Sequence, residues 1–125
     1  MGLTSDRNDP SLRKIKADGQ QESYLVLSEE ERAKGFLRPV RYSYTHLSCG
    51  SATRMGAALS ETYARNPKFY GGTFCCHCGK HFPLFLNEKW QFEWKPDGDP
   101  VGSDEQEAEE YLSEKKMKKH LGEGI

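Results

Sequence analysis

Two short motifs constrain this chain more than any other feature of its sequence. Residues 46–50 and residues 75–79 each contain two metal-binding side chains separated by two residues and followed immediately by glycine. A two-residue spacer lets both side chains reach one ion, and a glycine with positive φ lets the backbone turn closely around the ligands. The two units together supply a tetrahedral set of three thiolates and one imidazole. We therefore predict one structural Zn²⁺ site formed by His46, Cys49, Cys75 and Cys78.

Disulfide bonding is the competing interpretation of four cysteines in a short chain. Cys75, Cys76 and Cys78 lie within four residues of one another, where bridges between them would be strained. The first residues also lack the apolar stretch of a secretory signal, which favours a reducing, cytoplasmic setting. A redox Cys-x-x-Cys motif would need a thioredoxin-like βαβ context. Metal binding explains the spacing better.

Two residues near the second motif are alternative ligands. Cys76 could replace Cys75, with His81 as a further donor, although the two-residue spacer would then be lost. His81 could also replace His46 as the fourth ligand or make a hydrogen bond behind the site. The sequence leaves the choice between His46 and His81 open.

The apolar content supports a role for metal in folding. Only 35% of the residues are hydrophobic, whereas soluble domains average roughly 45–50% apolar residues. A structural zinc ion can contribute on the order of 10 kcal/mol to the stability of a small domain. Bound zinc would thus offset a thin apolar core.

The local patterns predict an α+β fold. Alternating residues 40–45 predict a strand leading into the first motif, and Thr53 can cap a helix that ends near Arg65. Residues 73–75 form a short strand, and residues 82–85 and 89–95 form a hairpin. Ser103 starts a final helix with acidic first turns and lysines near its end. The expected architecture is a small zinc-ribbon-like β core, with one helix inserted between two zinc knuckles and another at the C-terminus.

The same patterns divide the chain into three parts. Residues 1–20 are polar and lack a clear period, so we expect a flexible N-terminal arm. Residues 21–102 form the zinc-binding core, and residues 103–125 form the C-terminal helix.

Charge is distributed unevenly along the chain. Residues 41–95 contain seven basic and three acidic side chains, whereas residues 96–125 contain four basic and nine acidic ones. A nucleic-acid surface could use the basic middle, with aromatic rings stacking on single-stranded bases. Its candidates are Arg41, Arg54, Arg65, Lys68, Lys80, Tyr42, Tyr44, Phe69 and Tyr70. The acidic end would repel phosphates, which favours a protein partner over nucleic acid.

A family resemblance covers the stretch from Tyr44 to Trp94. Its motifs are His46-x-x-Cys49-Gly50, the run Glu-Thr-Tyr-Ala-Arg-Asn-Pro-Lys-Phe-Tyr-Gly at 61–71, and Thr-Phe-Cys-x-x-Cys at 73–78. This stretch resembles small uncharacterised zinc-ribbon-like proteins of bacteriophages and prophages. The resemblance implies a factor made early in infection that acts on a host target, such as a defence system.

The predicted function is that of a non-enzymatic, zinc-stabilised module that binds another protein. Four ligands leave no open position on the metal for catalysis. If His46 were not a ligand, the metal would have one open position, and Glu61 or Glu93 could act as general base beside it. The sequence signature of the zinc deaminases is absent, however. Nucleic-acid binding is the first alternative and a zinc enzyme the second. No motif for a small-molecule substrate and no membrane span is evident.

Overall fold

The computed structural model describes residues 2–123, and the side chains of residues 2–117. The described chain is a small α+β structure in which four small sheets are combined with helices. The elements are β1 (Gly2–Thr4), the 3-10 helix η1 (Pro10–Arg13), β2 (Ser23–Leu25), α1 (Glu29–Arg32), β3 (Ser43–His46), β4 (Ala52–Arg54), α2 (Ala57–Arg65), β5 (Gly72–Cys75), β6 (Lys80–Pro83), β7 (Phe85–Leu86), β8 (Lys89–Trp90), β9 (Phe92–Trp94) and α3 (Glu105–Glu123).

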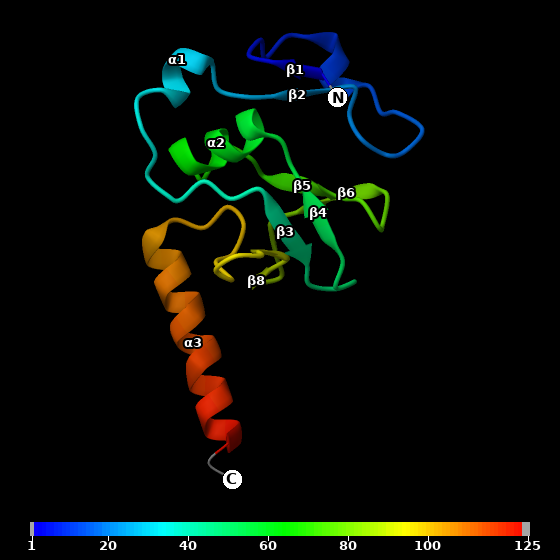
Figure 1. Ribbon diagram of the computed structural model, residues 1–125. Coiled ribbons are helices and arrows are strands. Elements are labelled where there is room, and N and C mark those ends of the chain that lie inside the picture. Colours follow the sequence, from blue (N-terminus) through cyan, green and yellow to red (C-terminus); the bar gives the residue numbers. More distant parts are fainter. Residues whose placement is uncertain (1, 124–125) are drawn as a thin grey trace.

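The N-terminal segment forms a layer over one side of the core (Figure 1). Strand β1 pairs in parallel with β2, and Val26 N donates to Thr4 O over 2.9 Å. Gly19, with φ of +93°, lies so close to the second motif that a Cβ there would come within 1.9 Å of Gly79 O. The structure thus differs from the flexible arm expected for residues 1–20, because backbone pairing and close packing join this segment to the core.

Two antiparallel hairpins carry the ligand motifs. Strand β3 pairs with β4, and strand β5 pairs with β6. Strand β9 adds to the other edge of β3, so one sheet has the order β4-β3-β9. Helix α2 lies between the hairpins in sequence, as predicted. It starts at Ala57 and not near Thr53, because Thr53 pairs with Tyr44 within the sheet.

An aromatic core lies between this sheet and α2. Tyr44 meets the rings of Phe92 and Trp94 edge-on, with centroids 5.6 and 6.0 Å apart. Tyr63 from α2 packs against Trp94 in the same way at 5.4 Å. The strict alternation of residues 89–95 predicts that Trp90, Phe92 and Trp94 all face inward. Phe92 and Trp94 are buried as this pattern predicts, whereas Trp90 is only half-buried.

The predicted hairpin of residues 82–85 and 89–95 is wrong in its pairing. Strand β6 pairs with β5 and β9 pairs with β3, which leaves only β7 and β8 to pair with each other. The turn between them is formed by Asn87 and Glu88, both with positive φ (52° and 62°). Two positive values are typical of the tight turns whose twist suits a two-residue hairpin loop.

Helix α3 extends away from the rest of the molecule (Figure 1). Its cap is Asp104 and not Ser103: Asp104 Oδ1 accepts from Glu107 N over 2.8 Å, and Glu107 Oε1 accepts from Asp104 N over 3.0 Å. Ser103 is buried and donates to Pro100 O. The predicted C-terminal helix includes residues 124–125, which lie outside the residues that the structure describes. The side chains of the lysines at 118 and 119, near its predicted basic end, also lie outside the described part.

Helix α3 is attached to the body near its beginning. Ala108 is buried, and the Tyr111 hydroxyl donates to Glu93 on β9. Lys115 Nζ lies 2.7 Å from the same carboxylate. Within residues 2–123, the helices lack the combination of length and apolar character that crossing a membrane requires.

Candidate metal centre

The first ligand pair lies in the turn between β3 and β4. His46 ends β3, and Cys49 follows within the turn. Gly50 has φ of +75°, and its N–H donates to His46 O over 2.7 Å. The glycine closes the turn, as predicted, because a residue with a side chain would be strained at this φ.

The second pair repeats this geometry between β5 and β6. Cys75 ends β5, Gly79 has φ of +69°, and Gly79 N donates to Cys75 O over 2.9 Å. Cys78 occupies the same position in this turn as Cys49 does in the first. The two turns are therefore matched knuckles, each with one ligand at a strand end and one within the turn.

The structure brings the four predicted side chains together. One donor atom from each of them lies within 4.8 Å of the other three. Cys49 Sγ is 3.5 Å from Cys75 Sγ, and Cys78 Sγ is 3.7 Å from His46 Nδ1. Two thiolates bound tetrahedrally to zinc at about 2.3 Å would be about 3.8 Å apart. The cluster could hold one metal ion.

Packing and one hydrogen bond fix the orientation of His46. Its ring packs against both Phe82 and Phe92, with centroids 4.4 and 4.7 Å away. Nδ1 faces the thiol of Cys78, and Nε2 lies 3.2 Å from Ser48 Oγ. Burial lowers the pKa of His46 and so favours the neutral ring, which is the form that binds metal. The contact with Ser48 occupies Nε2, and metal-binding histidines usually make such a hydrogen bond through their second ring nitrogen.

The three thiols of the cluster lie so close together that their ionisation favours binding of a cation. Loss of solvation, helped by the adjacent Cys75 and Cys49, raises the pKa of Cys78 to about 11. The pKa of Cys49 is lowered instead, chiefly by the N–H of Ser51. Three thiols this close cannot all ionise without a compensating charge, and a divalent cation supplies that charge. The donor set is one that structural zinc sites use.

Both alternative ligands lie outside the cluster. Cys76 is exposed, and its Sγ contacts Ala52 O over 3.3 Å. His81 Nε2 lies 2.9 Å from Tyr24 Oη, and its ring packs near Phe74. The geometry thus favours His46 over His81 as the fourth donor.

The candidate nucleic-acid residues fall into two groups. The predicted nucleic-acid contact is wrong for Arg41 and Tyr44, because both side chains are buried and cannot reach a nucleic-acid strand. Arg41 Nη1 pairs with Asp97 and Asp99 at 3.1 and 3.2 Å, and its guanidinium lies 5.0 Å from the Trp94 ring. The other seven candidates are all exposed or half-buried: Tyr42, Arg54, Arg65, Lys68, Phe69, Tyr70 and Lys80.

Sequence reasoning missed two features of this region. The contact of Ser48 with His46 could have been expected from a hydroxyl placed inside the two-residue spacer. The pairing of Arg38 and Arg41 with Asp99 joins residues about sixty positions apart, and no local signal announces it. This network ties the loop before β3 to the turn after β9.

Comparison with known protein families, with characterised proteins and with solved structures finds no match for this chain. The site is therefore interpreted from its own geometry.

Proposed function

We propose that the protein is a non-enzymatic binding module whose core is held together by one structural zinc ion. The cluster of His46, Cys49, Cys75 and Cys78 supports zinc, since three thiolates and one imidazole complete a tetrahedron. Each knuckle sits at a hairpin turn, which is the arrangement of a zinc ribbon. With four protein donors no position is left on the metal for water or substrate, and this argues for a structural role.

A groove beside α3 is the observation that carries the proposed binding function. It has a volume of about 500 Å³ and runs between the β7–β8 hairpin and α3. Phe85 and Trp90 of the β7–β8 hairpin line it together with Leu47 of the β3–β4 turn, and Tyr111 lines it on the helix side. Leu47 is 43% exposed and Phe85 is 50% exposed. Apolar side chains left open to water in a groove are typical of protein interaction sites.

The charges around this groove select the class of partner. Its lining includes Glu88 and three glutamates of α3, with Lys89 as the basic residue of the lining. Two lysines lie at its edge: Lys68 pairs with Glu107, and Lys115 lies 5.5 Å from the Tyr111 ring. Glu107, Glu110 and Glu114 are three and four residues apart, so they lie along one face of the helix. We infer that the partner presents a basic segment with apolar anchors.

Nucleic-acid binding is the less favoured function. The glutamates of the groove would repel phosphates, and two of the nine candidate contacts are buried in the core. The resemblance to phage proteins leads us to propose a bacterial host protein as the partner.

A peptide-binding measurement tests this function. The zinc-loaded full chain would be titrated into a fluorescein-labelled amphipathic peptide of leucine and lysine, and into its leucine–glutamate counterpart. We expect binding of the lysine peptide alone, weakening with salt because charge attraction contributes. A labelled single-stranded oligonucleotide serves as the competing ligand.

Matched charge reversals locate the site. Glu110→Lys with Glu114→Lys should weaken peptide binding at least tenfold, because both carboxylates line the groove. Glu105→Lys with Glu109→Lys makes the same change in net charge on another face of α3, and should leave affinity within about twofold. Equal effects of the two pairs, or preferential binding of the oligonucleotide, would contradict the proposal.

A further inference from the structure

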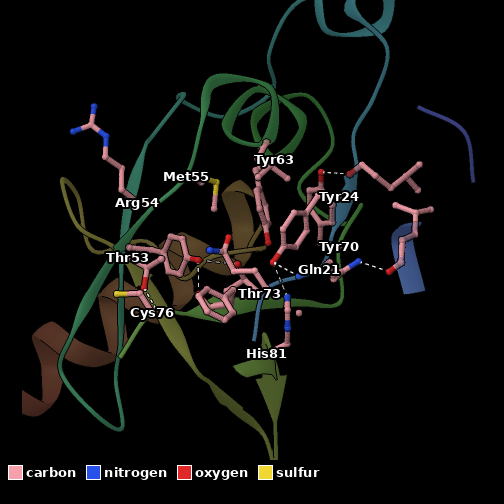
Figure 2. A pocket seen from close by; sticks show the side chains of 17 residues that line it. Gln21, Tyr24, Thr53, Arg54, Met55, Tyr63, Tyr70, Thr73, Cys76 and His81 are labelled. Carbon is pink, nitrogen blue, oxygen red and sulfur yellow. Dashed lines mark hydrogen bonds between the residues drawn. The ribbon is translucent and has the colours of Figure 1, made fainter. Parts of the chain in front are cut away.

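A second concave site shares no residue with the metal cluster or with the groove beside α3. It is a pocket of about 370 Å³, within the range of about 300–1,000 Å³ typical of small-molecule sites. Figure 2 shows that β2, α2, β5 and β6 all contribute side chains to it. The N-terminal layer forms one wall, so the pocket exists only because residues 2–25 dock on the core.

Aromatic rings form a large part of the wall, since four tyrosines, Phe74 and His81 line the pocket. Tyr63 and Tyr70 lie with ring centroids 4.7 Å apart, and Phe74 and His81 lie 5.3 Å apart. Tyr24 completes this side of the pocket beside His81. Such surfaces favour flat aromatic ligands, because rings stack face to face or edge to face with theirs.

The pocket offers a ligand no opposite charge. Arg54 is the only residue of the lining with a permanently charged side chain, and Figure 2 shows it extending away from the other side chains. No aspartate or glutamate lines the site. Burial lowers the pKa of His81, which keeps its ring neutral. An ion entering the pocket would lose its hydration without a partner, which is costly.

Hydroxyl groups supply hydrogen bonds inside these apolar walls. The Tyr63 side chain is 5% exposed, and none of the side-chain hydrogen bonds found among the described residues involves its hydroxyl. By contrast, the Tyr44 hydroxyl donates to Phe74 O and accepts from Thr73 Oγ1, and the Tyr70 hydroxyl donates to Leu25 O. Tyr63 is therefore the tyrosine of this site without a hydrogen bond of 3.5 Å or less among the described residues. Its hydroxyl has the neighbouring Thr73 hydroxyl as a looser partner, which a ligand would share or displace.

We propose that this pocket binds an uncharged heteroaromatic molecule of nucleobase or nucleoside size. The ligand's ring stacks among Tyr24, Tyr63 and Tyr70, and a polar atom at its edge bonds to the Tyr63 hydroxyl. This inference is independent of the protein-binding groove, because the two sites share no residue.

The test uses the zinc-loaded full chain with adenosine, thymidine and indole as neutral probes and benzoate as a charged probe. Nuclear magnetic resonance titrations would follow the tyrosine ring signals. We expect at least one neutral probe to shift the signals of Tyr63 and Tyr70 while leaving those of Tyr42 unchanged. Benzoate should bind at least tenfold more weakly than that probe.

Two conservative variants test the contact. Tyr63→Phe should weaken binding of the hydrogen-bonding probe about tenfold, or about 1.4 kcal/mol, without reducing thermal stability. Tyr42→Phe, at a ring 41% exposed and outside the pocket, should change nothing. The proposal is overturned if no neutral probe shifts Tyr63 at millimolar concentration, or if Tyr63→Phe binds as well as the natural protein. Binding of a single-stranded oligonucleotide without binding of either nucleoside would also overturn it.

Discussion

At the scale of residues, the cysteines of the cluster differ from the neighbouring Cys76 in what their side chains contact. Cys75 and Cys78 face the cluster, whereas Cys76 points to the carbonyl of Ala52 and is exposed. The spacing of two residues predicts this difference, because adjacent residues at the end of a strand point to opposite sides. The sequence therefore predicted the four side chains that the structure brings together, and the packing of His81 against Tyr24 places the alternative donor outside this cluster.

Substitution of two neighbouring cysteines tests this assignment. Mutating a residue that only supports a metal ligand typically costs roughly 10–100-fold in metal affinity. Cys78→Ser removes one of the four donors itself, so its zinc affinity should fall by more than this. The melting temperature should fall by more than about 10 °C, which corresponds to a few kcal/mol in a domain of this size. Cys76→Ser should change it by less than about 3 °C. Zinc content and thermal unfolding of both variants provide the measurement, and similar behaviour of the two would refute the assignment.

The Ser48 hydroxyl provides a second test at this scale. Ser48→Ala removes the contact to His46 Nε2 but no ligand, so we expect roughly tenfold weaker zinc binding in a protein that still folds. Competition with a chromophoric chelator measures the affinity. Ser43→Ala, on β3 away from the knuckle turn, is the matched control. An unchanged zinc affinity in Ser48→Ala would show that the contact does not support the ligand.

At the scale of elements, local signals were reliable where a turn or cap is made by neighbouring residues. Ser28 caps α1 by accepting from Glu31 N, and a serine placed three residues before a glutamate is the local sequence pattern of such a cap. Local signals failed to predict secondary structure where pairing between strands distant in sequence determines it. Thr53 has the chemistry of a helix cap, yet pairing with Tyr44 and a bond from Cys76 N to its hydroxyl hold it in β4. The same competition assigned β6 and β9 to different partners.

The β7–β8 turn gives a prediction at this scale. Glu88 has φ of 62°, a conformation that costs a residue with a side chain roughly 1 kcal/mol relative to glycine. Glu88→Gly should therefore raise the free energy of unfolding by up to about 1 kcal/mol. Urea denaturation would measure the gain, with Glu110→Gln as a control for loss of one exposed carboxylate. A destabilised Glu88→Gly variant would contradict this turn geometry.

At the scale of the whole molecule, the His/Cys cluster joins two hairpins that belong to separate sheets in the described part of the chain. Strands β3 and β4 carry one knuckle, and strands β5 and β6 carry the other. The N-terminal layer then packs on the second hairpin through Gly19. Composition indicated that the apolar core is thin, but the docking of residues 2–25 could not be predicted because their polar sequence shows no period.

Removal of the metal should therefore loosen the whole fold. Because an unfolded chain has no preformed site, the binding energy of zinc is also folding energy. A strong chelator should abolish the near-ultraviolet circular dichroism of the buried aromatics Tyr44, Tyr63 and Trp94, and added zinc should restore it. Spectra that do not change after complete zinc removal would show that the aromatic core folds without metal.

The central claim is that one zinc ion is bound by His46, Cys49, Cys75 and Cys78. Zinc-edge X-ray absorption of the purified full chain, combined with elemental analysis, tests it most directly. We expect one zinc per chain, with three sulfur neighbours at about 2.3 Å and one nitrogen neighbour at about 2.0–2.1 Å. A chain with no bound transition metal and with Cys49 in a disulfide, or a zinc shell with oxygen in place of one of these donors, would contradict it.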